Sequence, residues 1–241
     1  MTWALKRQIF FIFVFVVLFS GLGFFILSPY INRIPTCLDG ISNGDETGVD
    51  CGGSCSQACS FEVDQISLLW SRAFEVIPGR YNAVAYLENH NKNALVSKVK
   101  YRFRFADKNN IYIGQREGEA FIPPRSKLAI FEPAIGVGNS VPIFTHFEFT
   151  ELPIWQRVPE DKLNLIKILV SDIELLNQGT KPLLTATLKN SSLFFIPEIN
   201  VVAILYDESG NALGSSRTFI EEIGPEKSKA ISFTWPRGLT G

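Results

Sequence analysis

The chain has 241 residues, and its 23 Lys and Arg residues nearly balance its 24 Asp and Glu residues. No stretch concentrates positive charge as a nucleic-acid-binding surface does, so nucleic acid is not an expected partner. Twenty Phe residues against one Met, with many Val and Ile residues, favour strands over helices. The length outside the first apolar segment exceeds that of one ordinary β-sandwich, so two domains are expected.

The first feature along the chain is an uncharged apolar run, Ile9–Leu27, which follows Lys6 and Arg7. As a helix it would reach about 28 Å, close to the thickness of a bilayer's hydrocarbon core. A cleaved signal peptide has a shorter apolar core, followed by small residues at a cleavage site. Because the run continues through Phe24–Leu27, we expect a retained transmembrane helix over residues 9–28 that contacts membrane lipid. A signal peptide is the alternative.

The charges beside this run predict its orientation. Lys6, Arg7 and the terminal amine lie on the short N-terminal side, whereas Arg33 is the basic residue near the other end. Positive residues stay in the cytoplasm. We therefore expect residues 1–8 to form a cytoplasmic tail, and the bulk of the chain to lie outside the cytoplasm on a single-pass anchor in the cell membrane.

All four cysteines fall in the segment 29–61, at Cys37, Cys51, Cys55 and Cys59. A clustered, even set outside the cytoplasm predicts two disulfides, whose pairing stays open. Zinc is the alternative, but structural zinc sites usually show close cysteine pairs separated by a longer loop. The stretch resembles a short repeat of secreted proteins, C-x-[DN]-G-x-x-N-G-x-E-T-x-V-D-C-G-G-x-C-x-x-C, apart from its last spacing. This resemblance implies a disulfide-held knot without chemistry of its own.

The acidic residues of this segment raise the hypothesis of a calcium site. Positions 1, 5, 7 and 12 of an EF-hand-like loop would be Asp39, Asn43, Asp45 and Asp50. Position 3 is Ile41, whose side chain has no ligand atom, and no helical pattern flanks the loop. Asx turns, in which these side chains bond the local backbone, are the alternative. No other cofactor is expected.

Beyond Ser60 the pattern changes to alternating strands. In Lys98–Asp107, apolar residues alternate with four basic residues, which predicts a strand with one buried and one solvated face. A similar arrangement recurs about a hundred residues later, and ordered matches of this kind predict an internal duplication. The matched pairs are Asp107 with Asp207, Gly114 with Gly214, Ala85–Asn89 with Ala186–Asn190, and Ile122–Ile130 with Ile223–Ile231.

Turn signals about every ten residues in each copy are typical of an immunoglobulin- or fibronectin-like sandwich. We therefore expect an all-β soluble region of two tandem sandwiches of this type, after one N-terminal transmembrane helix. The first would span residues 62–157 and the second residues 158–241, with a linker at Glu151–Asp161.

The segment Leu205–Asp207, followed by Gly210, resembles the FxLYD-type domain and is similar to the desiccation-related sandwich of late-embryogenesis proteins. The first copy keeps Phe103 and Asp107 of that pattern but not its Leu-Tyr, and the second has Ala203 where Phe is expected. The resemblance implies a domain found on envelope proteins, mostly without an assigned function, and it offers no catalytic residues to carry over.

Catalytic motifs are not evident in the sequence. The two histidines, His90 and His146, fall in a polar turn and on an expected outward strand face. The sequence contains no G-x-S-x-G, no phosphate loop and no H-E-x-x-H. We therefore expect no catalytic residues, and a non-catalytic interaction or structural module of the cell envelope with an envelope protein as partner.

Two alternative functions stay open at this stage. One is ligand or polysaccharide binding at the cell surface through loop aromatics such as Trp155 or Trp235, although Trp70, Trp155 and Trp235 also suit a core or interdomain position. The other is an enzyme whose active site is built from residues distant in sequence. The oligomeric state does not follow from the sequence.

The second copy is expected to lack its last strand. The first copy has a closing strand within Val141–Thr150, whereas the second reaches Trp235-Pro236 and stops five residues later. Such a domain exposes an unpaired strand edge. The sequence favours a truncated piece of a longer chain, and completion by a partner or a second copy is the alternative.

Overall fold

The structure is a computed structural model that describes residues 3–31, 36–163 and 165–238. The chain divides into two compact units, Met1–Ser54 and Cys55–Gly241. This boundary falls inside the cysteine-rich segment that the sequence predicted as one piece.

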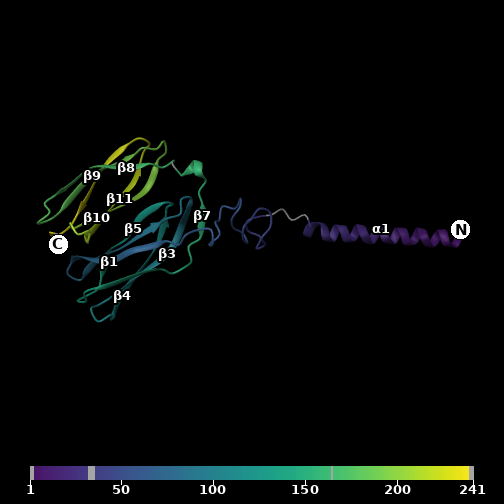
Figure 1. The fold of residues 1–241 in the computed structure, drawn as a ribbon, viewed down its shortest axis with the longest axis horizontal. Coiled ribbons are helices and arrows are strands. Elements are labelled where there is room, and N and C mark those ends of the chain that lie inside the picture. The colour runs from purple at the N-terminus through teal and green to yellow at the C-terminus, as the bar shows by residue number, and fades with distance from the viewer. Residues whose placement is uncertain (1–2, 32–35, 164, 239–241) are drawn as a thin grey trace. The chain divides into compact units, whose positions relative to one another are not determined.

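The first unit begins with the helix α1, Trp3–Ile31 (Figure 1). Its stretch Leu5–Leu27 is 23 residues long and apolar enough to cross a bilayer, with side chains exposed along its length. The prediction of one N-terminal helix of membrane-spanning length is confirmed. The helix starts earlier than expected, because residues 3–8 of the expected cytoplasmic tail are already helical.

In the second unit, the first group of strands forms two antiparallel sheets, which are ordered β1-β2-β5 and β4-β3-β6, with β7 pairing β3 as well. The bounds are β1 Ser67–Ile77, β2 Arg80–Asn89, β3 Ala94–Ala106, β4 Tyr112–Ile122, β5 Ser126–Gly136, β6 Phe144–Phe149 and β7 Trp155–Arg157. Side chains of both sheets meet in one buried cluster, which includes Leu87 of β2 and Phe103 of β3.

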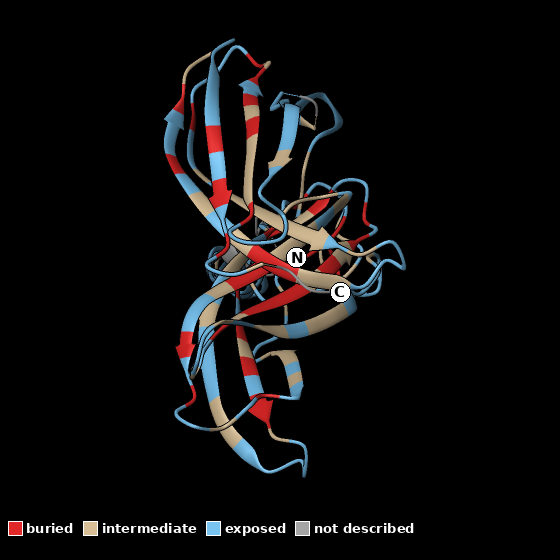
Figure 2. Cartoon of the chain, turned by 90° about the vertical axis from the view of Figure 1, so that its left-hand side faces the viewer, coloured by how far each residue is buried: buried red, intermediate tan, exposed pale blue. Residues whose placement is uncertain are grey.

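The strand β3 shows how the sequence builds this core. Its apolar residues Val99, Tyr101, Phe103 and Phe105 are at most 5% exposed, as the alternation predicted. The intervening cations point away from the core, and Figure 2 shows buried and exposed residues alternating along the strands.

The second group of strands forms a three-stranded sheet, β12-β9-β8, and a two-stranded sheet, β10-β11. The short helix η1, Glu160–Lys162, precedes it. The bounds are β8 Ile168–Leu176, β9 Leu183–Asn190, β10 Ile196–Tyr206, β11 Ala212–Ile223 and β12 Ser228–Thr234. Its core is smaller and includes Leu188, Phe233 and Trp235.

The pairings of β8–β12 repeat those of β1–β5. The register repeats as well, since Phe105 pairs with Gly114 in the first group and Leu205 pairs with Gly214 in the second. The turns after these strands also correspond, because Asp107 N–H donates to Ile111 O and Asp207 N–H donates to Asn211 O. Both groups therefore share a local plan over five strands.

A buried asparagine occupies equivalent places in the two groups. Asn89, at the end of β2, is 1% exposed and donates from Nδ2 to the carbonyls of Ala94 and Pro123. Asn190, at the end of β9, is 0% exposed and donates to the carbonyls of Phe194, Ile223 and Gly224. Each asparagine thus satisfies buried carbonyl groups that the sheets leave unpaired.

The expected linker Glu151–Asp161 is wrong in part. Its residues Trp155–Arg157 form the strand β7, which pairs with Ala94–Val96 of β3, and Trp155 is 6% exposed in the first core. Two prolines and a polar end are the local features that favour a linker in this segment. Only a long-range pairing, which local sequence does not report, gives these three residues their structure.

Among the described residues, no strand follows β12. The second group therefore has no counterpart of β6 or β7 in the part of the chain that the structure describes. The lack of a closing strand in the second copy as a whole stays a prediction.

Candidate interaction surfaces

The four cysteines are all disulfide-bonded, so the prediction of two disulfides is confirmed. Cys51, Cys55 and Cys59 are at most 9% exposed, and Cys37 is half-buried. Thiols held in this way offer no nucleophile. Disulfides of this kind persist in oxidising compartments, which is consistent with an extracytoplasmic segment.

Three of the four residues proposed for calcium lie together in the first unit. The Asp50 carboxylate accepts the backbone N–H groups of Asp39 at 2.9 Å and of Gly40 at 3.0 Å. Asp39 in turn accepts the N–H of Ile41 and the side-chain amide of Asn43. The bond of Asp39 to Ile41 is that of an Asx turn, whereas Asp50 bonds backbone groups ten and eleven residues earlier in the chain.

The fourth residue, Asp45, lies in a different set of contacts, since it accepts a 2.7 Å hydrogen bond from the Ser54 hydroxyl. The structure therefore brings Asp39, Asn43 and Asp50 together and uses their side chains to hold the backbone. Calcium binding at this loop stays a prediction.

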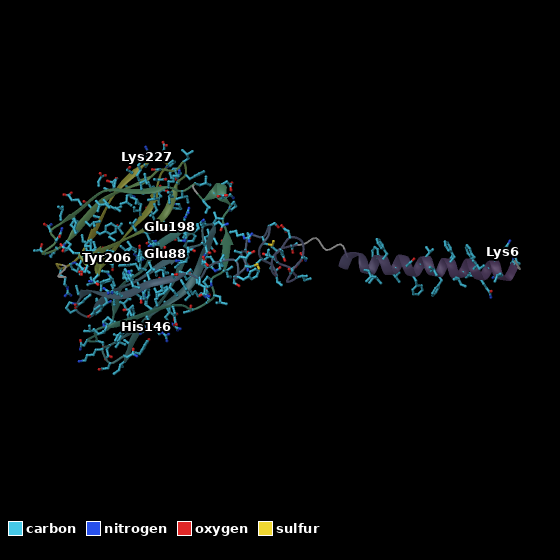
Figure 3. All side chains as sticks on the ribbon, viewed as in Figure 1. Lys6, Glu88, His146, Glu198, Tyr206 and Lys227 are labelled. Carbon is cyan, nitrogen blue, oxygen red and sulfur yellow. The ribbon has the colours of Figure 1, made fainter. Side chains whose placement is uncertain are left out.

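Both histidines are exposed. His90 follows β2, with its Nδ1 atom 3.7 Å from the Glu88 carboxylate, and His146 lies on the outward face of β6 (Figure 3). The outward strand position expected for His146 is confirmed. Neither histidine is placed between a nucleophile and an acid in the hydrogen bonds of the described residues.

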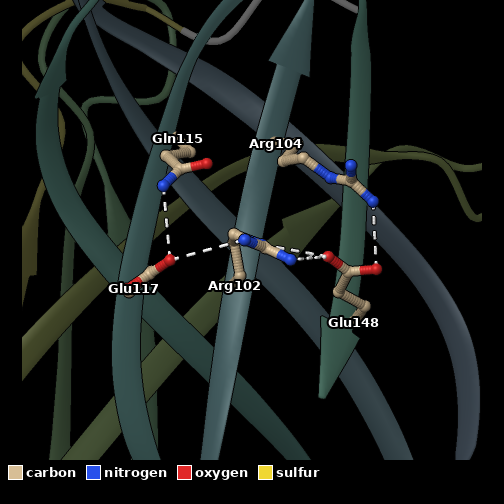
Figure 4. Close-up of polar contacts among 5 residues, drawn as sticks. All are labelled: Arg102, Arg104, Gln115, Glu117 and Glu148. Carbon is tan, nitrogen blue, oxygen red and sulfur yellow. Dashed lines mark hydrogen bonds and ion pairs between the residues drawn. The ribbon is translucent and has the colours of Figure 1, made fainter. Parts of the chain in front are cut away.

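The outward faces of β3, β4 and β6 carry a ladder of polar contacts (Figure 4). Arg102 donates to Glu148 from Nε at 3.0 Å and from Nη2 at 2.7 Å, and Arg104 donates to the other Glu148 oxygen at 3.0 Å. These bonds lower the pKa of the Glu148 carboxyl, and the bond from Arg102 has the largest effect. The ladder is half-exposed and pairs two arginines with two glutamates. It therefore aligns the strands and presents little net charge to a ligand.

A groove of about 740 Å³ lies between β10 and the strands β4 and β5. Tyr86, Tyr101, Phe121, Phe131 and Tyr206 contribute aromatic rings to its lining. Glu119, Lys127, Glu198 and Arg217 contribute charges of both signs. Tyr206 and Glu198 of β10, both part of this lining, are labelled in Figure 3.

Tyr101 is the most strongly perturbed group in this groove. Burial, and then its 2.8 Å hydrogen bond to Glu132, raises the pKa of Tyr101 well above its usual range. The phenol therefore stays protonated and donates to the carboxylate at any physiological pH. The ring is 5% exposed and its hydroxyl is already bonded, so Tyr101 lines the groove without offering a further donor, and it provides no base near neutral pH.

Sequence reasoning missed this groove because its lining comes from strands far apart in the chain. Alternation in β10 separates the residues facing the groove from those facing the core, but it does not say what lies opposite. The tryptophans proposed for ligand contact are not on exposed loops, since Trp155 and Trp235 are each 6% exposed in the cores.

A second surface feature belongs to the strands β8–β12. Large apolar side chains project from both faces of β8 and from the loop before β10, each at least half exposed: Leu169, Val170, Ile173, Leu193, Phe194 and Phe195. The loop bonds to the segment before β8 through Ser191 N–H and Lys167 O, at 2.8 Å. Contiguous exposed apolar side chains mark interaction sites, and Leu193, Phe194 and Phe195 are three such side chains in a row.

No protein-family model matches the chain, and no curated protein matches it closely enough to show a relationship.

Proposed function

We propose that the protein is a non-catalytic interaction module, anchored by α1 in the cell membrane and exposed on the extracytoplasmic side, within an envelope assembly. Its two groups of strands would be tandem copies of one immunoglobulin-like sandwich of the FxLYD type. The shared register of β1–β5 and β8–β12 supports the duplication, and the disulfides support the compartment.

The observation that carries the interaction role is the exposed apolar surface of the loop Leu193–Phe195. Leu193 is 76% exposed and Phe195 is 66% exposed, although the same group of strands buries Leu188 at 1%. Apolar side chains outside a formed core gain by about 25 cal/mol for each Å² that a partner removes from water. A protein partner on this surface would supply that burial.

Site-specific photocrosslinking in native membranes tests this role. A photoreactive residue at Leu193 or Val170 should give a discrete crosslinked product with an envelope protein. The same residue at Lys108, an exposed turn position in the first group, is the control and should give none. Equal products at all three positions, or none at any of them, would contradict the interaction role.

Binding of a sugar or another small ligand is a second candidate function, and the aromatic groove favours it. Tyr206 is 46% exposed at the groove, a position from which a phenol can stack on a sugar face. Calorimetric titration with envelope oligosaccharides should then show binding that Tyr206→Ala removes. Tyr112→Ala, an exposed tyrosine outside this groove, should leave it unchanged.

A further inference from the structure

The strands β3 and β10 occupy equivalent positions, and their first edges are equivalently paired. Tyr101, Phe103 and Phe105 of β3 pair with Gly118, Arg116 and Gly114 of β4. A hundred positions later, Val201, Ala203 and Leu205 of β10 pair with Thr218, Ser216 and Gly214 of β11. The second edge of the two strands differs.

In the first group, β6 and β7 occupy the second edge of β3. Phe103 pairs with Phe147 and Tyr101 with Phe149. In the second group, β10 has β11 as its sole strand neighbour among the described residues. Within the part of the chain that the structure describes, the other side of β10 is therefore an open edge, whose backbone groups pair with no strand.

Burial differs in the same way. Tyr101, Phe103 and Phe105 are at most 5% exposed beneath β6, whereas Val201, Ala203 and Leu205 are only partly buried. The ring of Phe147 lies 5.1 Å from that of Phe103 and 5.6 Å from that of Tyr101. The core of the second group is thus open along the strip that β6 covers in the first.

We propose that the free edge of β10 binds an extended segment of a partner protein, which adds as a strand antiparallel to β10. This inference rests on the proposed interaction function and specifies its partner. The occupant is a strand because the pairing of β3 with β6 shows what this position accepts within the same chain.

Two positions define the chemistry of the partner strand. Ala203 stands where the first group has Phe103, so the residue opposite Ala203 must be large and apolar, preferably aromatic, to fill the core. On the outward face, Val202 stands where Arg102 bonds Glu148. Val202 and Ile204 replace both cations that bond Glu148, and Arg217 lies one strand further away on β11. An acidic residue would therefore find no cation on β10, and an uncharged residue is expected opposite Val202.

The register also identifies the backbone groups that pair. In the first group, Thr150 N–H donates to Lys100 O, so the backbone groups of the even-numbered residues of β3 face β6. By the same register, the N–H of Val202 points to the free edge of β10, away from β11. Proline at this position removes that donor without breaking the β10–β11 ladder.

The test uses the full chain in lipid nanodiscs and a labelled peptide, PIFTHFVFT, which is the sequence of residues 142–150 with Glu148→Val. Saturable binding with protection of β10 amides is expected, and Val202→Pro should weaken it at least tenfold. Val202→Thr is the matched control and should keep it. Hydrogen exchange of β11 confirms that each variant is folded.

A second pair of measurements tests the side-chain prediction. Ala203→Phe fills the space opposite the peptide's aromatic residue and should also weaken binding at least tenfold. A peptide with Asp in place of that aromatic residue should not bind.

Several results would overturn the inference. Two of them concern the peptide: no binding, and binding that Val202→Pro leaves unchanged. The other two concern the chain without peptide. Protection of β10 amides in a dimer would assign the edge to a second copy, and the same protection in a monomer would show that the edge is already paired. If crosslinks from Leu193 persist when the peptide fails, the interaction function stands and the strand proposal falls.

Discussion

The buried asparagine Asn89 offers a sharp test of how the first group of strands is held together. Its Nδ2 group donates to Ala94 O at 2.9 Å and to Pro123 O at 2.8 Å. Its Oδ1 atom accepts the backbone N–H of Asn91 at 3.0 Å and the side-chain amide of Asn91 at 2.9 Å. The side chain is 1% exposed, so water cannot replace these bonds readily.

Two substitutions separate loss of the bonds from reversal of their polarity. Asn89→Ala leaves two carbonyls and a backbone N–H group without their partner, whereas the Asn91 amide keeps its bond to Asp64 O. At about 1–2 kcal/mol for each of the three groups, we expect a loss of about 3–6 kcal/mol in the free energy of unfolding. Asn89→Asp places a carboxylate against the carbonyls of Ala94 and Pro123. It should therefore cost at least about 1 kcal/mol more than alanine at pH 7.

The stability of the Asn89→Asp variant should also depend on pH. Burial beside two carbonyls raises the pKa of the new carboxyl above its unfolded value of about 3.9. The folded state then binds the proton more tightly than the unfolded state does. The variant should be least destabilised below pH 4 and lose stability as the pH rises towards the folded pKa.

Denaturant unfolding of the full chain in detergent, followed by near-ultraviolet circular dichroism, measures these losses. Asn93→Asp, at an exposed position in the same turn, is the control and should change stability by less than about 0.5 kcal/mol. If Asn89→Asp is no more destabilising than this control, the asparagine does not support the turn as described.

The remaining predictions concern the charged ladder, the orientation and the acidic loop. A double-mutant cycle on Arg102 and Glu148 should give a coupling of about 0.5–1 kcal/mol at pH 7. Because the folded pKa of Glu148 is lowered, the coupling should persist above the unfolded pKa and disappear as the pH falls through the folded value; a coupling unchanged at pH 2 would contradict this. Protease added to spheroplasts should digest residues 60–241, and complete protection would refute the proposed orientation. Asp50→Ala should speed hydrogen exchange at Asp39 and Gly40 at least tenfold, because their N–H groups lose an acceptor; unchanged exchange would show that the carboxylate does not hold the loop.

The parts of the fold that sequence could predict are those with a local signal. The alternation in Lys98–Asp107 identified the buried face of β3 because neighbouring residues of a strand point to opposite faces. The N-terminal helix follows in the same way from an uncharged apolar run, and the disulfide segment from a cluster of cysteines. The match of Asp107 with Asp207 located equivalent turns.

The parts that sequence could not supply depend on pairing between distant residues. The strand β7 is three residues long and exists because it pairs with β3 some sixty residues earlier. The aromatic groove and the free edge of β10 depend on which strand lies beside which. The role of Asp50 likewise emerges from its bonds to Asp39 and Gly40, since a carboxylate in a glycine-rich loop suits a metal or a turn equally well.

Residue-resolved hydrogen exchange of β10 and β3 distinguishes an open edge of β10 from a paired one. The test uses the full chain in nanodiscs without a partner. The backbone amides that point to the free edge of β10, those of Asn200, Val202 and Ile204, should exchange at least a hundredfold faster than their counterparts in β3. The counterparts are the amides of Lys100, Arg102 and Arg104, which face β6 or the segment after it. Equal protection of the two sets in a monomeric chain would show that the edge of β10 is already paired, and would contradict the account of the second group of strands as open to a partner.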